Sequence, residues 1–238
     1  MNLLALETAT QRLSVALWRD GVCHERAAEV VNGGSERLLP WVQALLAEAD
    51  MDFTALDGLA FGAGPGGFTG LRLACGVVQG LACGLDLPVV GIPSLEALAR
   101  VAWEQEQDCA RIFACLDARM DEVYCAAYEI RDGLPEIVLA PFVAAPQTLG
   151  ERVRPLLMNE GWLGCGDGFA AYPALADQVG RLERVIPGCW PTAAAVAHLA
   201  AARFAQGEGV DAALAAPLYV RDKVALTTAE RLARGGMK

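Results

Sequence analysis

The chain has 238 residues, of which 54% are hydrophobic and 20% are charged, so it can bury a substantial core and is not a disordered or low-complexity protein. Its 19 basic and 29 acidic side chains give a formal net charge of −10 at pH 7. Because such a surface repels phosphates, we expect another protein to make most of any contact with nucleic acid.

The first predicted element is a strand over the apolar run Leu3–Leu6. The first seven residues contain no basic side chain and end on Glu7, so they do not resemble a signal peptide. Side chains alternate over residues 13–18, which predicts a second strand. Asp20-Gly21 then predicts a hairpin turn into a third strand that ends near Val31. Two or three antiparallel strands therefore open the chain.

A helix is predicted after the break at Asn32-Gly33-Gly34, with Ser35 as its N-cap. Its broad apolar face carries Leu38, Leu39, Val42, Leu45, Leu46 and Ala49, with Trp41 beside it. The next predicted elements are a strand at 56–61, a glycine-rich segment at 62–68, a helix capped by Thr69 that ends near Leu85, a strand at 87–91 and a helix capped by Ser94 that ends near Gln105.

The predicted order over the first hundred residues is therefore β-β-β-α-β-α-β-α. Three meandering strands followed by alternating helices and strands are typical of the ribonuclease-H-like core. This α/β fold, with mixed sheets flanked by helices, is shared by the two-lobed actin, Hsp70 and sugar-kinase superfamily.

In the second half, strands are predicted at 111–116 and 123–130, joined by a turn at 117–121. Less regular segments are expected around Pro135, Pro141 and Pro146, then a strand at 162–166 and an alanine-rich helix from Pro191-Thr192 to about Ala205. The predicted organisation is an N-terminal lobe at 1–105, a smaller C-terminal lobe at 106–212 and a tail at 213–238 that packs back on the N-terminal lobe.

The segment Gly62–Phe68 contains Gly62-x-Gly64-x-x-Gly67, which formally matches the dinucleotide-binding fingerprint. It follows about the fourth strand rather than the first, and Phe68 stands where a P-loop needs lysine. Pro65 also lacks a backbone N–H for a phosphate. The sequence therefore favours a tight strand-to-helix turn over a nucleotide site.

Three glycines recur every four residues in the following helix, at Gly76, Gly80 and Gly84. Each costs a helix about 1 kcal/mol relative to alanine, so the stripe needs a reason. Close approach of another helix or strand is the simplest one. The sequence leaves open whether that neighbour belongs to this chain or to a partner subunit.

Residues for metal or nucleophilic chemistry are scarce. The two histidines, His24 and His198, are far apart in the sequence, and none of the three serines lies in a G-x-S-x-G elbow. The carboxylates Glu7, Asp117 and Asp121 could hold magnesium at a nucleotide, although acids beside strands and turns are more often simple surface groups. We predict no catalytic residue, no metal and no cofactor that the chain holds by itself.

The cysteines and the most apolar window bear on the compartment. The eight cysteines contain no C-x-x-C spacing and are expected to be reduced and buried. The window Leu71–Val90 is interrupted by polar and charged residues and by Pro88, so it is not expected to span a membrane. We expect a cytoplasmic protein.

Several segments resemble the TsaB (YeaZ) family. Residues 61–72, FGAGPGGFTGLR, resemble its G-x-G-P-G-S-F-T-G-L-R signature, with Gly67 in place of serine. Glu7 stands where aspartate is usual, and Gly34 where histidine is frequent. Further similar segments are 3–10, 35–40, 117–124, 166–168 and 217–222.

The resemblance implies a non-catalytic partner subunit with a two-lobed actin-like fold. Such a subunit would bind and activate the paralogue TsaD, which transfers a threonylcarbamoyl group to the adenosine next to the tRNA anticodon. The ATPase TsaE would be a further partner, and tRNA would be contacted only indirectly. The chain would form a homodimer when alone, and a nucleotide at a subunit junction is left open.

The resemblance also places the partner contact on the first two helices. The side chains expected to carry it are Leu39, Val42, Leu45, Leu46, Leu73, Gly76, Val77 and Gly80, with Arg72 at the edge. Two other functions stay open from the fold and the superfamily: a stand-alone ATP-dependent phosphotransferase of the sugar-kinase type, and a glycoprotease-like peptidase.

Overall fold

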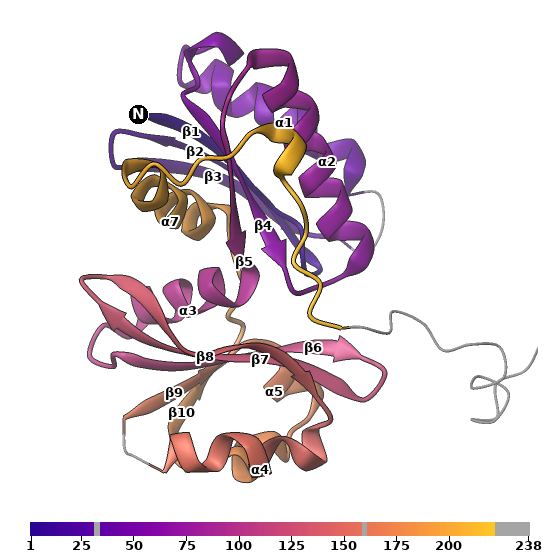
Figure 1. The fold of residues 1–238 in the computed structure, drawn as a ribbon, viewed down its shortest axis with the longest axis vertical. Coiled ribbons are helices and arrows are strands. Elements are labelled where there is room, and N and C mark those ends of the chain that lie inside the picture. Colours follow the sequence, from indigo (N-terminus) through magenta and orange to yellow (C-terminus); the bar gives the residue numbers. More distant parts are fainter. Residues whose placement is uncertain (31–33, 159–160, 222–238) are drawn as a thin grey trace, which may run out of the picture.

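The computed structural model describes residues 1–30, 34–158 and 161–221 and contains two five-stranded mixed sheets flanked by helices (Figure 1). The predicted break at Asn32-Gly33 and the predicted tail from residue 222 onward lie outside the described residues. The α/β fold class is as predicted.

The first sheet has the strand order β3-β2-β1-β4-β5. Strand β1 pairs antiparallel with β2 and parallel with β4. The elements of this region are β1 (Asn2–Glu7), β2 (Arg12–Arg19), β3 (Val22–Glu29), α1 (Ser35–Glu48), the 3₁₀ turn η1 (Phe53–Ala55), β4 (Gly58–Gly64), α2 (Phe68–Leu85), β5 (Val89–Pro93) and α3 (Ser94–Gln105).

The second sheet has the order β10-β9-β6-β7-β8, which repeats the topology of the first with β6 in the place of β1. No such repeat is visible in the sequence. The remaining elements are β6 (Arg111–Arg119), β7 (Glu122–Arg131), β8 (Leu134–Ala144), α4 (Pro146–Leu157), β9 (Trp162–Cys165), α5 (Gly168–Ala171), α6 (Leu175–Val179), β10 (Leu182–Ile186), α7 (Ala193–Ala205) and η2 (Ala212–Leu214).

The five layers of the molecule are α1 with α2, the first sheet, α7 with α3, the second sheet, and α4 with α5 and α6 (Figure 1). Both faces of each sheet are covered, which explains why β1 is a continuous apolar run rather than an alternating one. Leu4 and Leu6 of β1 pack towards α1 and α2, whereas Leu3 and Ala5 pack towards α7.

The predicted lobe boundaries are wrong for helix α7. This helix follows the second sheet in the sequence, yet it packs against β1 and β2 of the first sheet. Residues 193–205 therefore belong to the first lobe, and not to a lobe at 106–212. The reason is that α7 supplies the apolar layer that one face of the first sheet lacks.

Helix N-termini show where local signals succeed and fail. Thr192 caps α7 by accepting a hydrogen bond from the Ala195 amide at 3.2 Å. Ser35, Thr69 and Ser94 were predicted as caps, and this is wrong, because each lies inside its helix and no side-chain cap of those helices is found in the described part of the chain. The Ser94 hydroxyl instead donates to the Glu7 carboxylate at 2.9 Å.

Two further predictions need correction. The segment around Pro135, Pro141 and Pro146 is more regular than expected, because it forms the edge strand β8 and helix α4. Among the cysteines, Cys83 is exposed and Cys23 is half-buried, whereas the other six are buried as predicted.

Candidate functional site

The loop between β4 and α2 and the first turn of α2, which together we name the glycine loop, pack against the turn that follows β1. A Cβ added to Gly66 would lie 2.5 Å from the Ala9 carbonyl oxygen, and one added to Gly70 would lie 1.9 Å from the Thr8 carbonyl oxygen. The Gly67 amide donates to the Ala9 carbonyl at 2.7 Å. Atoms of the chain itself therefore occupy the space that a side chain would take. This confirms the tight strand-to-helix turn predicted from the sequence.

Glu7, at the end of β1, is fully buried and does not face solvent. Its carboxylate accepts hydrogen bonds from the Ala9 amide at 2.6 Å and from the Ser94 hydroxyl at 2.9 Å. Burial raises the pKa of Glu7 from its usual 4.5 to about 7, although the two hydrogen bonds act in the opposite direction. Glu7 therefore holds the turn in place from inside the lobe.

The three carboxylates considered for magnesium are not brought together. Asp117, at the end of β6, accepts a hydrogen bond from the Arg119 amide at 2.9 Å, and Asp121 lies in the turn before β7. Within the described residues, no group of three potential metal ligands occurs. The carboxylate beside Asp117 is Asp167, which accepts from the Asp117 amide at 2.9 Å.

A cleft of about 470 Å³ separates the two lobes at the ends of β1 and β6. Its first wall is the turn at Thr8–Gln11 with the start of α2, and its second wall is formed by residues 116–119 with Asp167. Burial raises the pKa of Asp167 above its usual value. The α2 N-terminus, for which no side-chain cap is seen among the described residues, could accept an anion. The opposite wall carries Asp117 and Asp167 together with Arg119, which pairs with Asp117 at 3.8 Å, so a phosphate would face two carboxylates and one guanidinium across the cleft.

The outer side of α2 is open. A Cβ added to Gly76, Gly80 or Gly84 would meet no atom within 4 Å. Of the two explanations for this stripe, packing against another part of the same chain is therefore wrong for the described residues. The stripe is a bare strip of backbone at the surface.

The predicted contact residues separate into two groups. Val42, Leu45 and Leu46 are 0–2% exposed and belong to the core beneath α1, so the prediction that they contact a partner is wrong. The broad apolar face of α1 is turned towards the first sheet, because that sheet needs a covering layer. Leu73 and Val77 are half-buried against the same core.

The exposed members of the prediction are Leu39, Arg72, Gly76 and Gly80. Leu39 is 46% exposed, and the Arg72 guanidinium lies 3.9 Å from the centre of the Phe68 ring. Phe68 itself is 39% exposed and was missed. The signal that could have identified this face is the composition of α2, which is apolar and long enough to cross a membrane although most of it lies outside the core.

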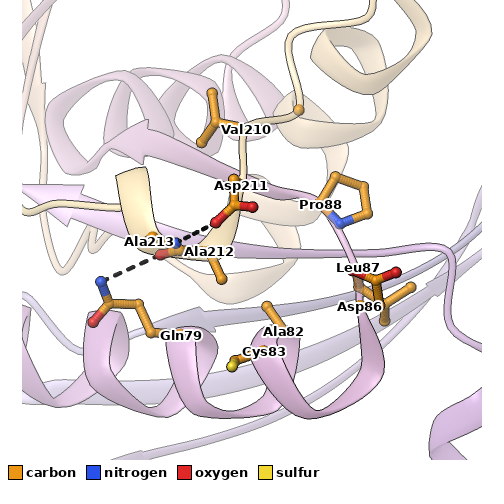
Figure 2. Close-up of a pocket in the computed structure, with 11 residues that line it drawn as sticks. Gln79, Ala82, Cys83, Asp86, Leu87, Pro88, Val210, Asp211, Ala212 and Ala213 are labelled. Carbon is orange, nitrogen blue, oxygen red and sulfur yellow. Dashed lines mark hydrogen bonds between the residues drawn. The ribbon is translucent and has the colours of Figure 1, made fainter.

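A second open groove, of about 610 Å³, runs between the C-terminal half of α2 and residues 209–213 (Figure 2). In Figure 2, Gln79 of α2 donates a hydrogen bond to the Ala212 carbonyl, at 3.3 Å, and Asp211 accepts one from the Ala213 amide, at 2.7 Å. Residues near the end of the chain are therefore attached directly to α2.

The two histidines lie on opposite faces of the first sheet. His24 is paired with Leu17, whose side chain packs towards α1 and α2. His198 of α7 packs against Trp18 on the other face, with ring centres 5.2 Å apart. They cannot act together as a pair of metal ligands.

The chain matches the family model of TsaD, tRNA N6-adenosine threonylcarbamoyltransferase, over residues 20–228. It is 37% identical over 227 residues to the tRNA threonylcarbamoyladenosine biosynthesis protein TsaB of Escherichia coli, covering 94% of this chain and 96% of that protein. TsaB of Haemophilus influenzae is 33% identical over 235 residues, covering 94% and 95%.

The solved structure of YeaZ from Pseudomonas aeruginosa superposes with a TM-score of 0.83 at 38% identity and covers 92% of this chain and 99% of that one. A second structure from that organism, described as an uncharacterized protein with similarity to peptidase YeaZ, has a TM-score of 0.85 at the same identity and coverage. These matches extend over both lobes and agree with the signature at residues 61–72. The chain therefore belongs to the TsaB (YeaZ) family.

Proposed function

We propose that this chain acts in tRNA threonylcarbamoyladenosine biosynthesis as a non-catalytic subunit that binds and activates the paralogous transferase TsaD. Relatives that carry this pathway in their names match nearly the whole chain, which supports the pathway. TsaE is a further partner in this proposal. The net charge of −10 supports a role in which other subunits make most of the contact with tRNA.

The observation that carries the proposal is the open face of α2. Glycines in a helix lower its stability, so an exposed stripe of them has a cost that nothing within the described chain offsets. Without side chains, a helix lets the backbone of a neighbouring helix approach closely. We name the exposed residues Leu39, Phe68, Arg72, Gly76 and Gly80 the outer helix face. It is the proposed contact with TsaD.

Two arrangements support a non-catalytic role. The glycine loop is filled by the turn after β1, so its backbone does not form an open phosphate cradle. The two histidines lie on opposite faces of a sheet, so they do not form a metal-binding pair. In this proposal the chain stabilises an active arrangement of its partner, and any nucleotide binds at the junction between subunits.

The same face serves self-association when TsaD is absent. A two-fold axis through the glycine stripe would bring two copies of α2 together through identical surfaces. The apolar composition of α2 then reflects a protein contact and not a membrane span, since strands β4 and β5 of one sheet hold both ends of the helix. The proposed location is the cytoplasm.

The test uses Gly76→Leu and Gly80→Leu. Leucine is a better helix former than glycine, so both variants should fold at least as well as the wild type while their side chains block close approach. Sedimentation and co-purification with TsaD should show a loss of association of about 100-fold or more. Glu151→Leu, on an exposed position of α4, is the matched control and should bind normally.

The functional arm measures threonylcarbamoyl transfer to tRNA in a reconstituted mixture. The proposal expects transfer to depend on this chain and to fall with both leucine variants. Equal transfer with and without the chain would show that it is not an activating subunit. Normal association of both leucine variants would show that the outer helix face is not the contact.

A further inference from the structure

Residues 212–221, which we name the strap, run along the first lobe before they reach the second. The Gln79 side-chain amide donates to the Ala212 and Ala215 carbonyls, at 3.3 and 2.9 Å. Further along, the Leu218 amide donates to the Ala63 carbonyl at 2.7 Å. The strap is therefore attached to both α2 and the end of β4.

A third attachment lies at the start of α2. The Tyr219 hydroxyl accepts a hydrogen bond from Arg72 at 3.1 Å, and the Tyr219 ring lies 5.8 Å from the Phe68 ring between centres. The tail is predicted to pack back on the N-terminal lobe, and Leu218 and Tyr219 contact that lobe. The sequence did not indicate where the strap goes next.

Arg221 carries the strap across to the second lobe. Its guanidinium pairs with the Glu122 carboxylate of β7 and donates to the Arg119 carbonyl at 3.3 Å. The same group lies 3.7 Å from the Met120 sulfur and over the Tyr124 ring. Only 13% of the Arg221 side chain is exposed, compared with 37% of the Glu122 side chain, so the guanidinium itself is largely covered.

The turn between β6 and β7, which Arg221 contacts, has an uncommon backbone conformation. Arg119, Met120 and Asp121 all have positive φ angles, of 60°, 58° and 59°. This left-handed region is disfavoured for residues other than glycine, and three in a row need support from their surroundings. Arg221 supplies part of that support from outside the hairpin, and the Asp117 carboxylate supplies another part by accepting from the Arg119 amide.

The contact lies at the mouth of the cleft between the lobes. The strap forms one wall of a cavity of about 220 Å³, whose other walls are the glycine loop and the β6–β7 turn. That cavity adjoins the 470 Å³ cleft, because residues 66–68 and 118–119 line both. Helix α3 lies between the two sheets on one side of the molecule. The strap connects the lobes on the opposite side (Figure 1).

We propose that the strap is a latch that holds the two lobes in one orientation and closes its side of the cleft, with Arg221 as the fastening side chain. Without Arg221, the strap is no longer fastened to the second lobe, and its attachments to the first lobe, including the bond from the Leu218 amide to the Ala63 carbonyl, open more often. The turn at 119–121 then loses a support, and the cleft opens on the strap side. The latch belongs to the isolated chain and does not depend on a partner subunit.

Amide hydrogen exchange read by mass spectrometry tests this on the full chain. In Arg221→Ala, peptides that cover the β6–β7 turn and those that cover the glycine loop should both exchange about tenfold faster or more, as should the Leu218 amide. Peptides from β1 and β9 should be unchanged. Arg221→Lys keeps the charge but loses the planar fork, so it should give an intermediate acceleration.

Arg119→Ala is the matched control. It removes an arginine from the same cavity, but the Arg119 side chain is 84% exposed, and Arg221 binds its carbonyl and not its side chain. This variant should exchange like the wild type at the glycine loop and at Leu218. If Arg221→Ala prevents folding, as read by circular dichroism, the comparison of Arg221→Lys and Glu122→Gln with Arg119→Ala decides the question.

Three results would overturn the latch. If the β6–β7 turn and the glycine loop both exchange at the wild-type rate in Arg221→Ala, the strap does not hold the lobes together. The same conclusion follows if both regions exchange at the wild-type rate in Arg221→Lys and in Glu122→Gln. Acceleration of the turn alone would show that Arg221 supports the hairpin without joining the lobes. Acceleration by Arg119→Ala equal to that of the Arg221 variants would also contradict the proposal.

Discussion

The glycine loop and the glycine stripe lie next to each other in the sequence and have opposite surroundings. In the loop, a Cβ on Gly66 or Gly70 would lie within 2.5 Å of a backbone carbonyl oxygen. In the stripe, a Cβ on Gly76 or Gly80 would meet nothing within 4 Å. The fold of the chain therefore requires the first pair but not the second. A glycine that is not needed for packing within the chain indicates a close contact with another molecule.

Gly70→Ala should change the free energy of unfolding most, and it tests the role of the glycine loop in this comparison. Its methyl group would overlap the Thr8 carbonyl oxygen, so the loop or the turn after β1 must move. We expect the free energy of unfolding to fall by about 4 kcal/mol. Urea unfolding measures this, with Gly84→Ala as the control because its added methyl group points into open space. The control should not be destabilised, because alanine is the better helix former, so a Gly70→Ala protein as stable as the control would break the comparison.

The next prediction concerns Glu7, which supports the same turn. The pKa of Glu7 is about 7 in the folded protein, compared with 4.5 ordinarily. Between these values the folded state binds more protons than the unfolded chain, so stability falls as the pH rises, and this loss is complete above pH 7. We expect its size to be about 3 kcal/mol.

Glu7→Gln should remove this part of the pH dependence. The measurement is the free energy of unfolding at about pH 5 and about pH 8, in the wild type and the variant. The difference between the two proteins isolates Glu7 from Glu96 and Asp167, whose pKa values are also raised by burial. Parallel pH profiles would show that Glu7 does not titrate in this window.

Ser94→Ala should destabilise the turn after β1 by a smaller amount. It removes the buried hydroxyl that donates to Glu7 at 2.9 Å. We expect the free energy of unfolding to fall by about 1.5 kcal/mol, since the hydrogen bond is buried and one partner is ionisable. The same change should raise the pKa of Glu7 further, which a shift of the pH profile to higher pH would reveal. An unchanged profile would mean that the hydroxyl does not stabilise the carboxylate.

Alanine substitutions in the glycine stripe should change the free energy of unfolding least, and they should raise it. Gly76→Ala and Gly80→Ala should each raise the free energy of unfolding of the isolated chain by about 1 kcal/mol, because alanine is the better helix former and its methyl group meets no neighbour. Urea unfolding at a protein concentration where the chain is monomeric measures this. A destabilisation would show that the stripe has a packing role within the chain and would remove the contrast.

Much of the fold could be predicted from periodicity and turn residues. The strands of the first sheet and helices α2, α3 and α7 follow from local patterns, because apolar spacing and glycine or proline breaks act over a few residues. Local patterns failed at the N-termini of α1, α2 and α3, where Ser35, Thr69 and Ser94 were predicted as caps and are not. Ser94 binds a carboxylate 87 positions away, and no local pattern indicates that contact.

The candidate site shows the same limit. The apolar stripe of α1 was identified, but sequence spacing does not say whether such a face turns towards a sheet or a partner, and Val42 is fully buried. Glycine in the loop and glycine in the stripe are indistinguishable without the positions of Thr8 and Ala9. The strap has no periodicity at all, so the attachment of Arg221 to the second lobe emerges only in three dimensions.

The placement of α7 has a consequence for synthesis on the ribosome. Strands β6–β10 are contiguous along the chain, so the second sheet can form once residue 186 has emerged. The strands of the first sheet are made earlier, but one face waits for α7, which ends at Ala205. Domains usually complete in the order of their translation. Here the nascent N-terminal half keeps an uncovered apolar surface until the C-terminal half has been built, and a chaperone would find its binding site there.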